Sequence, residues 1–361
     1  MTDQDHMRHA LALAARGLGR TWPNPAVGCV IVLDGRVVGR GHTQPGGRPH
    51  AEVMALAGIN AVGATAYVTL EPCAHHGQTP PCASALIAAG VARVVTALTD
   101  PDPRVAGRGH AMLRAAGIAV TEQVLAAEAA VANAGFLKRV TQGVPFVTLK
   151  LATTIDGRIA TQTGESRWIT GALSRRATHA MRLNHDAVMV GSGTALADDP
   201  DLTVRDLGVG HQPVRIVIDS KLRHAPQSRL GQTAKAAPVW MCHSVAAPAD
   251  RREAWQATGA RLIECPGTVD GHIDLRAAMQ VLGQAGLTRI LCEGGAGLAA
   301  ALIRAGLVDE LAHFSAGALI GAEGTAAVGP LGIAALGDAP RLRQLSVQAI
   351  GQDTLTRWAF G

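Results

Sequence analysis

Residues 64–82 read ATAYVTLEPCAHHGQTPPC, and this stretch decides the fold of the first half of the chain. Its apolar, partly β-branched beginning predicts a buried strand. The strand runs into a polar loop that contains Cys73, His75, His76, Cys82 and three prolines. Cysteine usually packs as a small buried hydrophobe, so two cysteines in such a loop need another explanation. A metal site is the first interpretation, and a disulfide is the second.

A second motif upstream favours the metal. Residues 49–56, PHAEVMAL, carry His50 and Glu52 at the start of a predicted helix. The pattern H-x-E followed by P-C and a further cysteine is typical of zinc-dependent deaminases. We therefore predict that His50, Cys73 and Cys82 bind Zn²⁺ and leave the fourth tetrahedral position to water. Glu52 is predicted to move a proton from that water to the leaving amino group.

The spacing of the two cysteines leaves alternatives open. Eight residues, AHHGQTPP, separate them, whereas the deaminase pattern has two. Either His75 or His76 could replace a cysteine as a ligand, and the remaining histidine would face the substrate. A purely structural zinc and two packed thiols without metal are the other interpretations. Glu52 favours catalysis, because a closed structural site needs no carboxylate beside its ligands.

The sequence around this loop predicts an α/β fold. Residues 27–43, VGCVIVLDGRVVGRGHT, predict a hairpin that turns at Asp34 and Gly35. Helical patterns over residues 2–17 and about 50–57 alternate with further strands, which indicates a mixed sheet with helices. A helical stretch over residues 122–140 is expected to end the first half.

A second α/β domain is predicted after the break TQGVP, so we expect domains 1–143 and 144–361. Strand-like runs separated by helical patterns continue through the second half. They are FVTLKLAT, DAVMVGSGT, VRIVID, APVWMCH, ARLIEC and TRILCEGG.

Composition excludes several classes of protein. The chain has 361 residues, of which 48% are hydrophobic and 17% are charged, as in ordinary globular proteins. No apolar run approaches the roughly 20 residues of a membrane helix, and the N-terminus does not resemble a secretory signal. The six cysteines are too sparse for a disulfide scaffold. A net charge of +5 with 3% aromatic residues suits an anionic small molecule better than a nucleic acid. We expect a cytoplasmic protein.

Two glycine loops predict a nucleotide or phosphate site in the second half. Gly295, Ala296 and Gly297 lie between a predicted strand and helix, and residues 191–194, GSGT, follow another strand. Backbone amides at such turns bind anions. Arginines nearby suit phosphate, because the guanidinium presents paired donors.

Motifs in both halves resemble one family. NPAVGCVIV, HAEVMAL, TLEPCAHHGQTPPC and DPDPRVAGRG resemble the deaminase half of the bifunctional riboflavin-biosynthesis deaminase/reductases. LKLATTIDGRIAT, GESRWIT, ADDPDLTVR and EGGAGLA resemble the reductase half. The resemblance covers nearly the whole chain. It implies a cytidine-deaminase-like domain followed by a dihydrofolate-reductase-like domain, which would use Zn²⁺ and NADPH, respectively.

The implied substrate is a phosphorylated pyrimidine, 2,5-diamino-6-ribosylamino-4(3H)-pyrimidinone 5′-phosphate. The first domain would hydrolyse its 2-amino group, and the second would reduce the ribosyl group to ribityl. A homo-oligomer is also expected. The alternative is a zinc nucleoside or tRNA deaminase with a C-terminal nucleotide-binding regulatory module. A zinc-stabilised binding protein without enzymatic activity is a third possibility.

The resemblance also implies individual roles. The cofactor contacts would be Ala152, Trp168, Thr194, Asp198, Gly295, Ala296, Gly297 and Leu298. The substrate contacts would be Ser166, Arg182, Leu202, Arg205 and Glu293 in the reductase, and Asn24, His42 and His75 in the deaminase.

Asp198 and Lys150 are assigned to the reductase chemistry, with the Lys150 ammonium steadying an oxygen as the sugar ring opens. One departure concerns Gln78. Relatives often carry Lys or Arg at this position, so a charge that could meet the substrate phosphate is missing.

Overall fold

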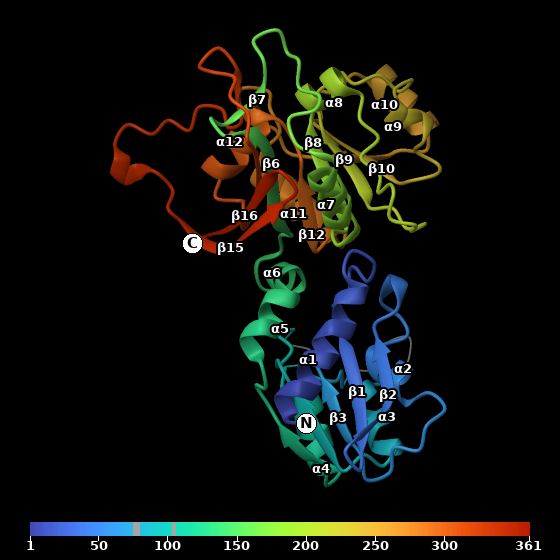
Figure 1. The fold of residues 1–361 in the computed structure, drawn as a ribbon. Coiled ribbons are helices and arrows are strands. Elements are labelled where there is room, and N and C mark those ends of the chain that lie inside the picture. The colour runs from blue at the N-terminus through green and yellow to red at the C-terminus, as the bar shows by residue number, and fades with distance from the viewer. Residues whose placement is uncertain (75–79, 103–105) are drawn as a thin grey trace. The chain divides into compact units, whose positions relative to one another are not determined.

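The computed structural model describes residues 1–74, 80–102 and 106–361 (Figure 1). The chain divides into two compact units, Met1–Gly143 and Val144–Gly361, each with its own sheet. Across the described ranges, every helix is too short or too polar to cross a bilayer.

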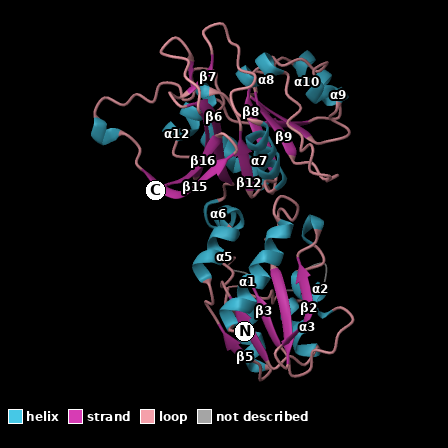
Figure 2. Ribbon diagram, viewed as in Figure 1, coloured by secondary structure: helices cyan, strands magenta, loops and turns pink. Residues whose placement is uncertain are grey.

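The first unit is a five-stranded mixed sheet with helices on both faces (Figure 2). The strand order is β2-β1-β3-β4-β5; β1 is antiparallel to β2 and β3, and β3, β4 and β5 are parallel. In chain order the elements are α1 (Asp3–Ala14), η1 (Ala15–Gly17), β1 (Gly28–Leu33), β2 (Arg36–His42), η2 (Pro45–Gly47), α2 (Ala51–Leu56), β3 (Thr65–Val68), α3 (Cys82–Ala88), β4 (Arg93–Thr96), α4 (Arg108–Ala115), β5 (Ala119–Thr121), α5 (Ala126–Ala132) and α6 (Ala134–Gln142).

Alternation along β1 explains the two layers of helices. Successive side chains of a strand point to opposite faces. Cys29 and Ile31 pack in a core with α2, α3 and α4, whereas Val30 and Val32 pack in a second core with α1 and α5. Because both faces are covered, β1 is apolar throughout instead of alternating with polar residues.

The predicted hairpin and first helix are confirmed. Asp34 and Gly35 both have positive φ, 50° and 73°, as a tight two-residue turn requires. Thr2 caps α1 through a capping box with Asp5. The single helical stretch predicted over residues 122–140 was wrong, because it is two helices, α5 and α6, that meet at Asn133. Asn133 leaves the helical region with φ −100° and ψ 16°, which suits a residue that favours helix ends.

The second unit is built on a nine-stranded sheet in the order β11-β10-β9-β8-β12-β6-β13-β16-β15. Strands β11 to β13 are parallel along this order, and β16 and β15 continue it antiparallel. The elements are β6 (Phe146–Thr154), β7 (Arg158–Ala160), α7 (Ala172–Leu183), β8 (Ala187–Gly191), α8 (Ser192–Asp198), β9 (Val214–Ile218), α9 (Arg229–Gln232), β10 (Val239–His243), α10 (Ala249–Ala257), β11 (Arg261–Glu264), α11 (Leu275–Gln284), β12 (Arg289–Cys292), α12 (Ala296–Arg304), β13 (Glu310–Ala316), β14 (Thr325–Ala326), η3 (Leu336–Asp338), β15 (Leu342–Ile350) and β16 (Asp353–Phe360).

The order of the central strands indicates where a ligand would bind. Strand β12 lies between β6 and β8, which are far apart from it in sequence. In such parallel sheets, ligands bind beyond the carboxyl ends of strands where the chain order changes direction. Residues 191–194, predicted as a glycine loop, end β8 and begin α8 without a loop, and residues 293–295 of the second glycine segment join β12 to α12.

Candidate active sites

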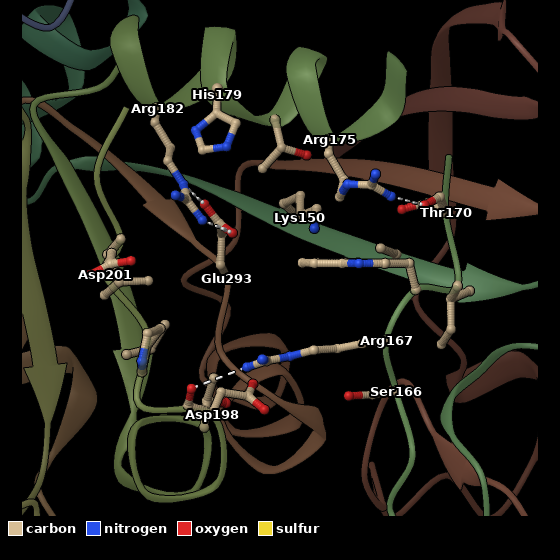
Figure 3. Close-up of a pocket in the computed structure, with 18 of the residues that line it drawn as sticks. Lys150, Ser166, Arg167, Thr170, Arg175, His179, Arg182, Asp198, Asp201 and Glu293 are labelled. Atoms are coloured by element: carbon tan, nitrogen blue, oxygen red, sulfur yellow. Dashed lines mark hydrogen bonds and ion pairs between the residues drawn. The ribbon is translucent and has the colours of Figure 1, made fainter. Parts of the chain in front are cut away.

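The larger cavity, of about 460 Å³, lies in the second unit beside β6, α7 and the segments after β8 and β12 (Figure 3). Most residues predicted for the reductase line it together. They are Lys150, Ala152, Ser166, Trp168, Arg182, Thr194, Asp198, Leu202, Arg205 and Glu293. The predicted loop over residues 295–298 is not part of this lining, but Gly295 N–H donates to Thr194 Oγ1 at 2.8 Å. The two glycine segments are therefore in contact.

Arg182 and Glu293 form a paired ion bridge at the cavity. Arg182 Nε lies 2.6 Å from Glu293 Oε1, and Nη2 lies 2.9 Å from Oε2, which is the two-pronged geometry that guanidinium groups favour. The side chains are only 12% and 10% exposed. Burial alone would raise the pKa of Glu293, but the Arg182 guanidinium outweighs burial and lowers this pKa to about 2. Glu293 is therefore a carboxylate at neutral pH.

Lys150 projects from β6 into the same cavity (Figure 3). Burial lowers the pKa of Lys150, with the Arg182 charge adding to this effect and Glu293 opposing it. Ala152 lies two residues further along β6 and therefore on the same face of the strand. An ammonium with a reduced pKa can give up a proton more easily than an ordinary lysine.

Trp168 offers a flat surface at the cavity. Its side chain is 67% exposed, which is unusual for a large apolar residue. The Arg175 guanidinium lies over the ring at 4.5 Å from its centroid. Arg167 donates to the backbone oxygen of Asp198 at 3.2 Å. The predicted cofactor residues Trp168 and Asp198 are therefore each in contact with an arginine of the cavity lining.

Sequence reasoning missed several lining residues, and α7 contributes three of them: Arg175, Thr178 and His179. A signal was available. Arg175, Thr178, His179 and Arg182 are spaced three or four residues apart, so they lie on one face of α7. Because Arg182 was predicted to contact the substrate, this spacing could have predicted the other three.

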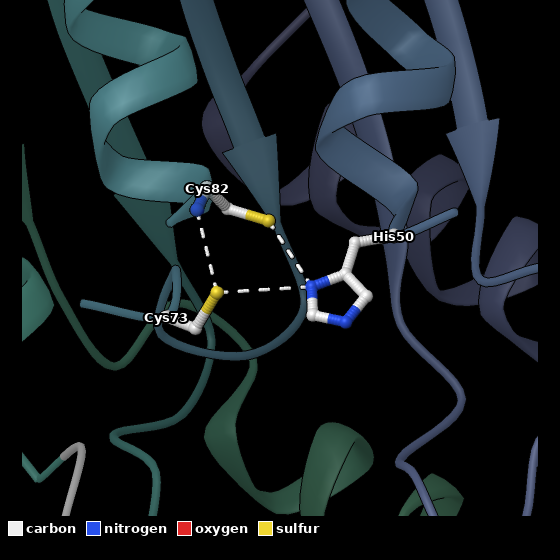
Figure 4. Close-up of side chains that lie close together, drawn as sticks. All are labelled: His50, Cys73 and Cys82. Atoms are coloured by element: carbon white, nitrogen blue, oxygen red, sulfur yellow. Dashed lines mark hydrogen bonds between the residues drawn. The ribbon is translucent and has the colours of Figure 1, made fainter. Parts of the chain in front are cut away.

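The first unit brings His50, Cys73 and Cys82 together (Figure 4). His50 Nδ1 lies 3.2 Å from Cys82 Sγ and 3.7 Å from Cys73 Sγ, and the three ligand atoms all lie within 4.8 Å of one another. Ligand atoms bound to one tetrahedral zinc ion are about 3.5–3.8 Å apart. One imidazole and two thiols at these distances fit Zn²⁺, and three protein ligands leave a position for water.

Close packing fixes the histidine. His50 is the N-cap of α2, and α2 lies so close to β2 that a Cβ on Gly41 would come within 2.1 Å of the Ala51 oxygen. A Cβ on Gly39 would likewise come within 2.1 Å of the Ala55 oxygen. Glycine at these two positions is therefore needed to hold the helix, and with it His50 and Glu52, against the sheet.

The contacts of the two cysteines favour a thiolate, the form that binds a metal cation. Cys82 begins α3, and its backbone N–H donates to Cys73 Sγ at 3.3 Å. Contact with the Cys82 thiol lowers the pKa of Cys73 to about 4, although burial opposes this shift. The same contact raises the pKa of Cys82. One of the pair is thus already a thiolate at neutral pH, and metal binding would displace the other proton.

Glu52 lies two residues after His50 and is 3% exposed. Burial raises the pKa of Glu52, which suits a group that takes up and returns a proton near neutral pH. Together with His50, Cys73 and Asn24, Glu52 lines a cavity of about 250 Å³.

The other predicted deaminase contacts are placed differently. His42 ends β2, where its backbone oxygen accepts from the Gln44 side chain at 2.9 Å, and it is not among the described residues that line the cavity. His75, its alternative His76 and the departure at Gln78 lie outside the described residues.

Twelve further residues line this cavity without having been predicted, and they include Arg48, Glu71, Asp100, Asp102, Phe136 and Arg139. Glu71 is buried and accepts from the N–H groups of Asp100, Gly107, Gly109 and His110 at 2.8–3.3 Å. This carboxylate therefore holds the segment after β4 against the end of β3. Its place two residues before Cys73 was the available signal.

These two sites define the class of protein: a two-domain enzyme with a zinc-binding deaminase domain in one unit and a reductase domain with a cation-rich cavity in the other. Residues 1–98 match the family model for the cytidine and deoxycytidylate deaminase zinc-binding region. Residues 145–356 match the model for the RibD C-terminal domain. The chain belongs to the RibD family of riboflavin biosynthesis proteins, as the sequence motifs indicated.

Relatives match over the full length. Riboflavin biosynthesis protein RibD of Escherichia coli (strain K12) is 46% identical over 98% of this chain and 98% of its own. RibD of Aquifex aeolicus is 38% identical over 97% and 96%. Among solved structures, Acinetobacter baumannii RibD has a TM-score of 0.89 at 39% identity and covers 99% of both chains. A diaminohydroxyphosphoribosylaminopyrimidine deaminase/5-amino-6-(5-phosphoribosylamino)uracil reductase from Thermotoga maritima has a TM-score of 0.87 at 33% identity over 99% of both.

Proposed function

We propose that this chain catalyses two consecutive steps on one phosphorylated pyrimidine. The unit Met1–Gly143 would hydrolyse the 2-amino group of 2,5-diamino-6-ribosylamino-4(3H)-pyrimidinone 5′-phosphate. The unit Val144–Gly361 would then reduce the ribosyl group to ribityl with NADPH. The observation that carries the proposal is the cluster of His50, Cys73 and Cys82 with Glu52 beside it, in a chain whose second unit holds a cation-rich cavity.

In the deaminase site His50, Cys73 and Cys82 would hold Zn²⁺, which makes a bound water acidic enough to supply hydroxide near neutral pH. Glu52 accepts the proton of the attacking water and returns it to the amino group as that group leaves as ammonia. Its burial keeps competing water away from the carboxyl group. Asn24, at the same cavity, is available to orient the pyrimidine.

In the reductase site NADPH supplies a hydride, so the protein itself needs no redox group. Trp168, Thr194 and Asp198 would bind the cofactor, and Ser166, Arg182, Leu202, Arg205 and Glu293 the substrate. The bound cofactor would supply this hydride to C1′ of the ribosyl group, and the bond between C1′ and the ring oxygen would break. Lys150 gives a proton to that oxygen as the ring opens.

Two measurements test the whole proposal. The zinc-loaded protein with the diamino substrate should release one ammonia per substrate. NADPH is then added, and its oxidation is followed by the loss of absorbance of the reduced nicotinamide. The amount of NADPH oxidised should equal the amount of ammonia released. Ammonia release from cytidine or tRNA without NADPH oxidation would instead support a nucleoside or tRNA deaminase with a regulatory second unit. NADH used as well as NADPH would overturn the choice of cofactor.

Arg205→Ala tests the phosphate contact. Arg205 lines the reductase cavity, and its guanidinium pairs with Asp201 at 2.9 Å. Loss of a hydrogen bond to a charged group should weaken binding of the phosphorylated substrate by about 1.5–3 kcal/mol, seen as a higher reductase KM. Arg251→Ala is the control, because Arg251 is exposed on α10 and donates to the Lys221 backbone oxygen, and neither residue lines the cavity. An unchanged KM in Arg205→Ala would remove Arg205 from the site.

We also propose that the chain associates with a second copy through β15. This strand is the last in its sheet, pairs with β16 alone among the described strands, and exposes Leu345 and Val347 at 44% and 57%. An apolar, unpaired edge strand is a template for pairing with another chain. Sedimentation should give a dimer for the native protein and a monomer for Val347→Lys. A native monomer at about 50 μM, well above the Kd expected of a specific interface, would contradict the proposal.

A further inference from the structure

His179 stands out among the residues of the reductase cavity that the proposed mechanism does not use. It projects from α7 into the cavity and is half-buried (Figure 3). Arg182, one turn further along α7, is also in the lining. The charged groups that act on the His179 ring are Arg182, Arg205 and Glu293. All three are proposed substrate contacts, so the ring lies within the region where substrate would bind.

The hydrogen bond from Arg205 indicates which nitrogen of His179 accepts and which carries the proton. The backbone N–H of Arg205 donates to His179 Nδ1 at 3.2 Å, so Nδ1 is an acceptor. Burial lowers the pKa of His179, and the charges of Arg182 and Arg205 lower it further, whereas Glu293 and the Thr203 backbone oppose them. The ring is therefore neutral at neutral pH. In a neutral imidazole whose Nδ1 accepts, Nε2 carries the hydrogen and is a donor.

Helix α7 makes two hydrogen bonds to residues 202–205, the segment proposed to bind the substrate. Arg182 Nη1 donates to the Thr203 oxygen at 2.7 Å, while His179 accepts from Arg205 N–H two residues later. The segment carries Leu202 and Arg205, both proposed substrate contacts. Leu202 is buried with φ of 54°, a conformation that needs support from its surroundings. His179 is thus part of the support for this segment.

We propose that His179 is a substrate-positioning residue of the reductase. Its Nδ1 holds the backbone of Arg205, and its Nε2–H donates to an oxygen of the phosphorylated ribosyl substrate. The inference rests on the proposed reductase function, and it adds a neutral ring donor beside the cations Arg182 and Arg205.

Two substitutions separate the functions of the two ring nitrogens. The amide of Asn reaches the position of Nδ1, and the longer amide of Gln reaches that of Nε2. His179→Asn keeps an acceptor for Arg205 N–H but loses the donor to the substrate. We expect the KM for the deaminated substrate to rise about tenfold, the effect of one hydrogen bond to a charged or strongly polar group. The kcat and the KM for NADPH should stay within about twofold. His179→Gln keeps the donor and should hold the substrate KM within about threefold of the native value.

Binding of NADPH, followed by protein fluorescence, shows that the second unit of each variant is folded, and deaminase activity in the same preparations shows that the first unit is intact. His272→Asn, at an exposed histidine of the second unit, is the matched control. An unchanged substrate KM in His179→Asn would overturn the inference, as would an equal rise in the KM for NADPH. If the native protein fails to oxidise NADPH with the deaminated substrate, the proposed function itself is overturned, and the assignment of His179 goes with it.

Discussion

Glu52→Gln is expected to lower the deaminase kcat by about 10²–10⁴-fold while zinc stays bound. Gln has nearly the same shape as Glu but cannot accept a proton from water or return it to the leaving amine. Glu52 is not one of the three metal ligands, so the cluster of His50, Cys73 and Cys82 remains complete in the variant. Ammonia release measures the rate, and elemental analysis of the same sample measures zinc.

Two controls make this result specific. NADPH oxidation with the deaminated substrate should stay at the native rate, because the reductase cavity lies in the other unit. Cys82→Ser should by contrast lose zinc together with deaminase activity, since it removes a thiolate ligand. Full ammonia release from Glu52→Gln with zinc still bound would mean that another group moves the proton.

Local signals in the sequence were enough to propose the metal site, whereas most residues of the reductase cavity were assigned through the resemblance to the family. The H-x-E pattern with P-C and a later cysteine predicts that His50, Cys73 and Cys82 meet, although the eight residues between the cysteines left His75 or His76 open as an alternative ligand. Segments that follow parallel strands meet at one edge of the sheet. The approach of Thr194 to Gly295 is therefore a consequence of the predicted α/β fold.

Other features depend on contacts between distant segments, which spacing does not encode. Glu71 holds backbone groups about thirty to forty residues away, and His179 is defined by its bond to Arg205. Strand β13 and the antiparallel strands β15 and β16 that follow it in the sheet were not predicted. Strand β13 alternates regularly between buried and half-buried residues, but β15 is exposed along most of its length and carries no such pattern. An edge strand can form on its neighbour without a buried face of its own.

Lys150→Met is expected to lower the reductase kcat by about 10²–10³-fold, the usual effect of removing one group that stabilises charge on a reacting oxygen. Met fills a similar volume, and Lys150 is not one of the proposed cofactor contacts. The Kd for NADPH, measured by titration of protein fluorescence, should therefore change by less than about threefold. A kcat within about threefold of the native value would exclude Lys150 from the chemistry.

The pH dependence of the rate separates a proton donor from a residue that only fills space. Burial lowers the pKa of Lys150, so its ammonium is lost as pH rises through a value below that of an ordinary lysine. Glu293 stays a carboxylate over this range, because Arg182 holds its pKa at about 2 despite burial. We expect the native kcat to fall on the alkaline side at a pH below about 10.4. In Lys150→Arg, whose guanidinium keeps its proton to much higher pH, any remaining activity should lose this alkaline fall. An alkaline fall at the same pH in Lys150→Arg would assign the titration to a different group.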